Sequence, residues 1–270
     1  MEKIKNAIEK AKSQSPSQTV GNDAVHSKRA GKDENLEIVE YTKTKVIDFD
    51  PVILEKNRII ALNKTDPLTS VFDSLRTQVL QKMEENNWRT LAIVSPTQDS
   101  GKTLVSINLA ISIAQQPQKT AMLVDFDMRR PRVANYLGIK SEASVYDYLR
   151  NQAELADVMI NPGIPRLVIL PSNRAVVRSS ETLSTKVTER LINELKDRYD
   201  SRVVIFDLPP ILNADDALVV LPQVDCVLLV VSSGVNTKAE IDESMRLLEN
   251  YNLVGVTFNR TEAHNAGYYY

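Results

Sequence analysis

Three segments of the chain carry side chains whose types and spacing match what a triphosphate and its magnesium ion require. Each segment is a short apolar run that breaks into a polar loop, and the loops contain Gly101, Lys102 and Thr103, then Asp125 and Asp127, then Asp207. One ammonium group, one hydroxyl and three carboxylates can bind phosphates and a divalent cation. The pattern therefore predicts a protein that uses a nucleotide.

The first segment, SPTQDSGKT over residues 95–103, predicts a phosphate-binding loop between a strand and a helix. Backbone N–H groups at the start of a helix have no partner within the helix and attract phosphate. Lys102 adds a full positive charge for the β and γ phosphates, and the Thr103 hydroxyl is suited to ligate magnesium. The predicted nucleotide contacts from this loop are Asp99, Ser100, Gly101, Lys102, Thr103 and Leu104.

This loop departs from the common pattern G-x-x-x-x-G-K-[ST] in its composition. Pro96 stands where the pattern has glycine, and Asp99 adds a negative charge to a loop that holds anions. The charge of Asp99 is unfavourable there unless its side chain points to solvent.

The second and third segments place Asp125, Asp127 and Asp207 just beyond buried strands. In an open parallel sheet, ligands bind outside the carboxyl ends of the strands. Three carboxylates gathered there repel one another unless a cation lies between them, which favours Mg²⁺; the alternative is that each caps a helix. Three arginines in the second segment either bind a phosphate or a neighbouring subunit, or form a solvated turn: Arg129, Arg130 and Arg132.

The elements that must position these loops appear from residue 89 onward, where apolar runs alternate with longer amphipathic stretches. The runs predict strands at residues 91–94, 121–124, 167–170, 203–206, 227–231 and 253–258, and helical patterns lie at 103–115, 145–149, 180–199, 215–221 and 238–251. This alternation is typical of an α/β fold: a P-loop NTPase-like, mostly parallel central sheet with helices on both faces.

Ahead of that region, residues 45–49 predict an edge strand and residues 66–87 a helix. The helix has Thr69 or Ser70 as its expected cap, and its apolar stripe consists of Val71, Phe72, Leu75, Val79, Leu80 and Met83.

The chain divides into three expected parts. Residues 1–56 contain an N-terminal amphipathic helix (1–12) and a flexible linker (13–35), residues 57–260 form the nucleotide-binding domain, and residues 261–270 are a mobile tail. The tail ends in Tyr268, Tyr269 and Tyr270, which are either an inert end or a cluster of phosphoacceptors.

Composition excludes several classes of protein. The formal net charge of −2 gives no bulk attraction to nucleic acid, so no nucleic-acid partner is expected. The apolar runs are far shorter than the ~18–20 residues of a membrane helix, and the charged N-terminus does not resemble a signal peptide, which predicts a cytoplasmic protein. Cys226, the one cysteine, is expected to be a core thiol, and with two histidines a zinc site is disfavoured.

The segments VDFDMRRPRVANYLGI, IFDLPPIL and GVTFNR resemble, in this order, the bacterial tyrosine kinases (BY-kinases) that govern capsule and exopolysaccharide synthesis. The stretch LTSVFDSLRTQVL ahead of the phosphate loop is similar to that family as well. The resemblance covers residues 57–260, and the opening MEKIKNAIEKAK is similar to members whose membrane partner is a separate chain.

The resemblance implies ATP-dependent protein-tyrosine phosphorylation, chiefly autophosphorylation between subunits, with ATP and Mg²⁺. It implies that Lys102 binds ATP, that Asp127 helps to activate the tyrosine hydroxyl, and that Asn259 lies near the adenine. The implied catalytic residues are Lys102, Asp125 and Asp127, the metal ligands are Thr103, Asp125 and Asp207, and the phosphoacceptors are Tyr268, Tyr269 and Tyr270. The implied partner is a membrane polysaccharide co-polymerase or chain-length regulator that recruits the chain to the inner face of the membrane, and self-association is expected.

The resemblance leaves ring assembly and two other functions open. Several relatives carry Glu-x-x-Arg-x-x-Arg in the helix before the phosphate loop, whereas this chain has Ser70, Asp73 and Arg76. One alternative is a MinD/ParA-like switch ATPase, although those proteins have a signature lysine where this chain has Thr97. The other is a nucleotide-binding regulatory subunit of a polysaccharide co-polymerase, without turnover.

Overall fold

The computed structural model describes residues 44–47, 49–198 and 201–261, and all of them belong to one compact unit. The expected N-terminal helix, the linker and the three tail tyrosines lie outside the described residues. Among the helices that are described, none has both the length and the apolar character needed to cross a bilayer.

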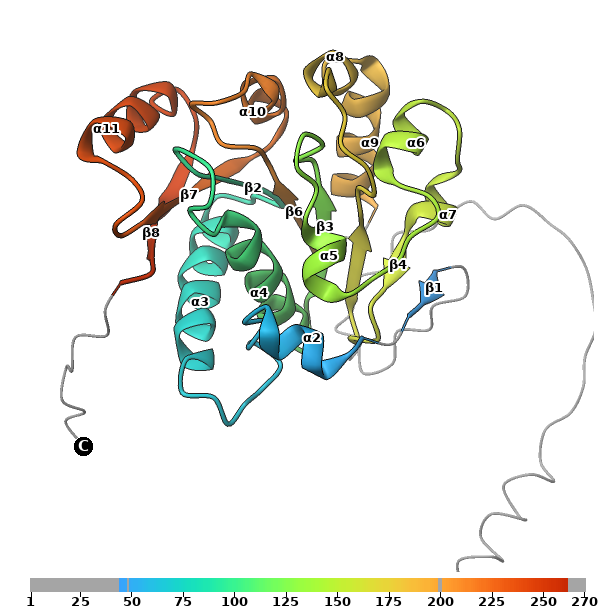
Figure 1. The fold of residues 1–270 in the computed structure, drawn as a ribbon, viewed down its shortest axis with the longest axis horizontal. Helices are drawn as coiled ribbons and strands as arrows, with labels where there is room; N and C mark the ends of the chain where they lie inside the picture. Colours follow the sequence, from blue (N-terminus) through green and yellow to red (C-terminus); the bar gives the residue numbers. More distant parts are fainter. Residues whose placement is uncertain (1–43, 48, 199–200, 262–270) are drawn as a thin grey trace, which may run out of the picture. The chain divides into compact units, whose positions relative to one another are not determined.

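An eight-stranded sheet, in the order β1-β4-β5-β3-β6-β2-β7-β8, forms the centre of the unit (Figure 1). Its strands are β1 Lys45–Val46, β2 Thr90–Val94, β3 Thr120–Asp125, β4 Ile160–Asn161, β5 Leu167–Leu170, β6 Arg202–Asp207, β7 Cys226–Ser232 and β8 Leu253–Asn259. Neighbouring strands are parallel except for β4 and β5, which are antiparallel. The mostly parallel sheet, its six main strands and the edge strand near residue 45 are therefore confirmed.

Helices cover both faces of this sheet. They are α2 Pro51–Lys56, α3 Thr69–Glu85, α4 Lys102–Ala114, α5 Val133–Leu137, α6 Val145–Leu149, α7 Leu155–Val158, α8 Ser179–Leu183, α9 Lys186–Asp197, α10 Asp216–Val220 and α11 Lys238–Leu247, with a 3-10 turn η1 at Leu221–Gln223. Successive side chains of a strand point to opposite faces. In β2, Leu91 and Ile93 join the core beneath α2 to α5, while Ala92 and Val94 join the core on the α6 to α11 side.

One predicted helix, residues 180–199, is two helices in the structure, α8 and α9. The break falls at Ser184 and Thr185, where the Thr185 hydroxyl caps α9 and accepts a hydrogen bond from the Thr188 backbone N–H. Serine and threonine hydroxyls that bond the local backbone compete with helix continuation. Clustered hydroxyl residues thus ended α8 where apolar periodicity alone predicted one long helix.

The predicted apolar stripe of α3 is correct in its later turns and wrong at its first. Val79 and Met83 are buried, whereas Val71 is 59% exposed. The expected cap is also wrong, because the residue before the helix is Leu68, without a side-chain cap bond. Thr69 lies inside the helix and donates its hydroxyl to the backbone oxygens of residues 60 and 63.

The residues of α3 that stand at the ring-assembly positions bond to their own chain. The Arg76 guanidinium lies 2.7 Å from the Asp73 carboxylate and also donates to the Ser112 hydroxyl of α4. The Ser112 hydroxyl in turn donates to Asp73. This triad joins α3 to α4, the helix that begins at the phosphate loop.

Met83→Ala should lower the free energy of unfolding by about 2–5 kcal/mol, because it leaves a cavity in the core under α3. Val71→Ala, in the same helix but exposed, should change it by no more than about 0.5 kcal/mol. Urea denaturation of both variants measures the contrast. Equal losses would show that the first turn of α3 is covered in solution.

Candidate functional site

The loops that follow three adjacent strands, β3, β6 and β2, meet at one edge of the sheet. Asp125 at the end of β3 is the register partner of Asp207 at the end of β6, and Asp207 is in turn paired with Ile93 of β2. Lys102 and Thr103 begin α4 directly after the β2 loop. The three segments that the sequence singled out are thus brought together, as expected for the carboxyl ends of parallel strands.

The backbone of the phosphate loop is held in a conformation that only glycine fits. Gly101 has φ +87°, and a Cβ placed there would lie 2.0 Å from Nδ2 of Asn259. That amide of Asn259 donates to the Ser100 backbone oxygen at 3.0 Å. Asn259, predicted near the adenine, therefore contacts the loop from the end of β8.

Asn236 is a second brace of the loop that sequence reasoning missed. Its Nδ2 donates to the Thr97 hydroxyl at 2.8 Å, and its Oδ1 accepts from the Ser100 hydroxyl and from the Ser232 backbone N–H. These bonds tie the loop to the end of β7. The hydroxyl of Thr97, the residue at the position of the switch ATPases' lysine, thus accepts a hydrogen bond from the Asn236 amide.

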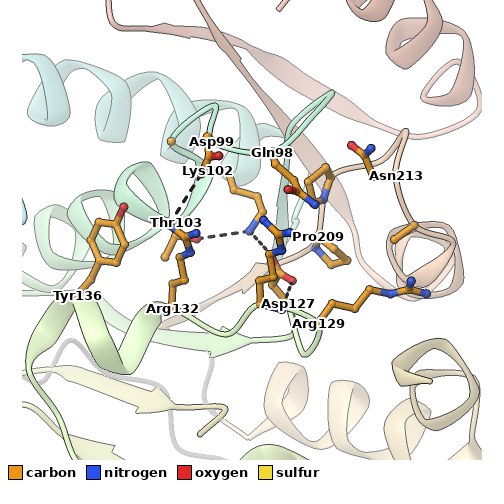
Figure 2. Close-up of a pocket in the computed structure, with 14 residues that line it drawn as sticks. Gln98, Asp99, Lys102, Thr103, Asp127, Arg129, Arg132, Tyr136, Pro209 and Asn213 are labelled. Atoms are coloured by element: carbon orange, nitrogen blue, oxygen red, sulfur yellow. Dashed lines mark hydrogen bonds and ion pairs between the residues drawn. The ribbon is translucent and has the colours of Figure 1, made fainter. Parts of the chain in front are cut away.

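Lys102 is the cation that lies among the carboxylates in this structure. Its Nζ is 2.7 Å from Oδ2 of Asp127 and 3.6 Å from Oδ1 of Asp207, and the residue is only 8% exposed. Burial by itself would lower the pKa of Lys102, but the carboxylates of Asp207, Asp127 and Asp125 raise it above the ordinary lysine value. The ammonium group of Lys102 is therefore charged, and it faces the pocket shown in Figure 2.

Asp207 accepts two hydroxyl hydrogen bonds from the first turns of α4. Oδ2 accepts from the Thr103 hydroxyl at 2.6 Å, and Oδ1 accepts from the Ser106 hydroxyl at 3.1 Å. Burial raises the pKa of Asp207, while Lys102 and the Thr103 hydrogen bond oppose that change. Ser106 was not predicted, and it fixes the carboxylate that shares the predicted metal site with Thr103.

Asp125 is fully buried and only half satisfied. Its Oδ2 accepts from the backbone N–H groups of Arg132 and Val133, at 3.2 and 3.1 Å, whereas its buried Oδ1 has no hydrogen-bond partner among the described residues. Burial and repulsion by Asp207 raise the pKa of Asp125 well above the ordinary carboxyl value. A buried acceptor without a partner is costly unless a ligand or water completes it.

The carboxylates do not by themselves enclose a metal. Within the described ranges, no group of three or more His, Cys, Asp or Glu side chains is arranged to hold one. The sequence suggested three carboxylates around a metal, and one of them, Asp127, is paired with Lys102 in this structure. The predicted ligands Thr103, Asp125 and Asp207 lie close together at this edge of the sheet, and their role in holding a metal stays a prediction.

A pocket opens in front of Lys102, between the phosphate loop and the loop after β3 (Figure 2). Asp99 lines it with φ +59°, and its side chain is 65% exposed, so its charge meets the solvent. Leu104 is not among the residues that line this pocket, and Ser100 is buried beneath the loop. The predicted loop contacts thus separate into those that face the pocket and those that support it.

The loop after β3 is anchored to α10 by Arg129. Its Nε donates to the buried Asp216 at 2.8 Å, and the same guanidinium bonds Asp215 at 3.1 Å. Asp216 also accepts from the Ser179 hydroxyl of α8. Asp215, Asp216 and Ser179 were not predicted as site residues, since their partner lies 37 to 87 positions away and leaves no local pattern.

Comparison with known proteins gives a consistent result. A family model described as an AAA domain matches residues 88–253. Tyrosine-protein kinase etk of Escherichia coli (strain K12) is 34% identical over 199 residues, which cover 73% of this chain and 27% of that protein. The chain thus spans 27% of the length of this curated relative. The putative tyrosine-protein kinase CapB of Staphylococcus aureus is 26% identical over 206 residues, covering 75% of this chain and 89% of CapB.

A solved structure agrees with these relatives in fold and in extent. The kinase domain of Escherichia coli tyrosine kinase ETK superposes with a TM-score of 0.70 and 30% identity, covering 83% of this chain and 94% of that domain. Both the converging loops and these similarities lead to one assignment: the chain belongs to the family of bacterial tyrosine kinases.

Proposed function

We propose that this chain is an ATP-dependent protein-tyrosine kinase that phosphorylates chiefly its own tyrosines, between subunits, in capsule or exopolysaccharide biosynthesis. One observation carries the proposal: the buried Lys102 ammonium lies between Asp127 and Asp207 at the start of α4. The relatives named tyrosine-protein kinases support the same activity. The tail tyrosines Tyr268, Tyr269 and Tyr270 are the proposed acceptors.

The residues of the site fit a magnesium-bound nucleotide. Gly101 and the start of α4 offer unpaired backbone N–H groups to phosphate oxygens. Thr103, Asp207 and the unpartnered Oδ1 of Asp125 would hold Mg²⁺ directly or through water. When bound, the ion neutralises phosphate charge in the transition state.

The chain's own residues would then orient the acceptor and stabilise charge. Lys102 is placed to bind the transferring phosphate group, and Asp127 to accept the hydrogen bond of the acceptor phenol. Oδ1 of Asp127 accepts from the Arg130 backbone N–H at 3.1 Å, which fixes the carboxylate. A carboxylate is a much weaker base than a phenolate, so the proton is transferred late, after the bond to the leaving group has weakened.

A separate membrane co-polymerase or chain-length regulator is the proposed activator, and it would recruit the chain to the inner face of the membrane. This part of the proposal rests on the family resemblance. Each phosphotyrosine adds about −1.5 to −2 charges, so tails that carry several phosphates would repel one another and loosen a fully phosphorylated assembly of like subunits.

The proposal is tested by incubating the full chain with Mg·ATP and analysing tryptic peptides for phosphotyrosine. We expect phosphate on the tail tyrosines, reduced at least about a hundredfold in Lys102→Met, because a positioned charge is lost. Lys119→Met is the matched control, since Lys119 pairs with Glu84 before β3, away from the site. Free phosphate without phosphotyrosine would favour the switch ATPase instead.

Asp127→Asn should reduce autophosphorylation about a hundredfold, because an amide orients the phenol poorly and cannot take its proton. Binding of Mg·ADP should change little, as Asp127 is not assigned to the metal. Initial rates from a phosphotyrosine immunoblot measure the effect. Undiminished autophosphorylation would remove Asp127 from the mechanism.

Asp125→Asn should stabilise the nucleotide-free chain at neutral pH while impairing catalysis. Because the pKa of Asp125 is raised in the folded state, its contribution to stability is complete below the ordinary carboxyl pKa and is lost as the pH rises through the folded value. The unfolding free energy of the variant should therefore exceed that of the wild type increasingly as the pH rises. Urea denaturation at pH 5, 6, 7 and 8 measures this difference, and a constant difference would contradict the pKa assignment.

A further inference from the structure

The pocket in front of Lys102 is lined by more basic side chains than acidic ones. Its charged lining residues are Asp99, Lys102, Asp127, Arg129, Arg130 and Arg132. Lys102 is paired with buried carboxylates, and Arg129 with Asp215 and Asp216. Arg130 and Arg132 do not have such buried acidic partners among the described residues.

Arg130 and Arg132 are exposed and weakly paired. Among the described residues, no acid lies within ion-pair distance of the Arg130 guanidinium, and Arg132 has only Asp99, at 3.8 Å. Figure 2 shows Arg132 reaching toward Asp99 across the pocket mouth, while Arg129 points away from Lys102. Since Asp99 is itself mostly exposed, this pair contributes little and is easily exchanged.

The backbone fixes where these two side chains begin. The N–H of Arg130 donates to Oδ1 of Asp127, and the N–H of Arg132 donates to Oδ2 of Asp125. The same residues therefore hold the proposed catalytic carboxylates with their amides and present guanidinium groups to the pocket. A group bound by these side chains would lie beside the acceptor position that Asp127 marks.

We propose that Arg130 and Arg132 form a subsite for a phosphotyrosine adjacent to the acceptor tyrosine. This inference rests on the proposed function and names the preferred substrate of the same site. Guanidinium groups bind phosphate through paired, charge-assisted hydrogen bonds, and a phosphotyrosine carries about −1.5 to −2 charges.

The sequence supplies a substrate of this kind. Tyr268, Tyr269 and Tyr270 are consecutive, and no acidic residue lies between Ala263 and Tyr270. A phosphate placed on one of them thus adds a negatively charged side chain beside the next tyrosine. Each transfer moves the γ-phosphoryl group to a phenol oxygen, releases ADP and a proton, and improves binding of the neighbouring acceptor.

The test uses the full chain with Tyr268, Tyr269 and Tyr270 changed to Phe, so that its own tail does not compete. Two fluorescein-labelled HNAGYYY peptides, one unmodified and one phosphorylated at its last tyrosine, are titrated by fluorescence anisotropy in Mg·ADP. We expect the phosphopeptide to bind about tenfold more tightly or better. In Arg130→Gln/Arg132→Gln the difference should fall to about twofold or less.

The matched control is Arg198→Gln/Arg246→Gln, which removes two exposed arginines that precede β6 and β8, at the opposite end of the sheet. It should keep the preference for the phosphopeptide. Equal binding of the two peptides by the wild-type site would overturn the subsite, and so would an equal loss in the control, which would indicate charge alone.

Affinity for a fluorescent ADP analogue is measured on the same variants. Loss of ADP affinity in Arg130→Gln/Arg132→Gln with the phosphopeptide preference intact would assign the arginines to the nucleotide and overturn the subsite. The peptide titration needs no turnover, so its failure is separate from failure of the phosphotyrosine assay, which tests the proposed kinase itself.

Discussion

The structure of the site depends on one buried ammonium group held among three carboxylates. If Lys102, Asp125, Asp127 and Asp207 are all ionised, their formal charge is 1 − 3 = −2 in a region that water hardly reaches. Burial and repulsion between the carboxylates raise the pKa values of Asp125 and Asp207 above the ordinary carboxyl value. A dication would bring the sum to zero, so the charge deficit itself favours a bound cation such as Mg²⁺.

The fold tolerates the repulsion between these carboxylates because strand register fixes the positions of the charged groups. Asp125 and Asp207 are neighbours across the β3–β6 pair and cannot separate without breaking the ladder. Around them, side chains from distant elements brace each loop: Asn236 and Asn259 hold the phosphate loop, and Asp216 holds Arg129. Such support confines the reactive groups to a narrow range of positions, which catalysis by orientation requires.

The sequence predicted the parts of this arrangement that depend on local patterns. Six apolar runs became strands, and the three polar loops met because parallel strands end at one edge. It did not predict the braces, since Ser100 and Asn236 are 136 residues apart and an asparagine after a strand has no distinctive signal. Short elements such as the four-residue α7 were missed because they complete barely one helical turn. The exposure of Val71 depends on which neighbours cover α3, and apolar periodicity contains no information on that.

The loop after β3 has two chemically different sides. Its backbone amides face the buried carboxylates of Asp125 and Asp127, whereas its arginine side chains face the pocket. Arg129 alone is neutralised by the fold, through the buried Asp216, so it anchors the loop and is not free to bind a substrate. Neighbouring arginines of one short loop therefore have different roles, which depend on the acidic side chains that each of them contacts. An arginine that pairs with a buried acid stabilises the fold, whereas an arginine that contacts only solvent or an exposed acid is free to bind an anion.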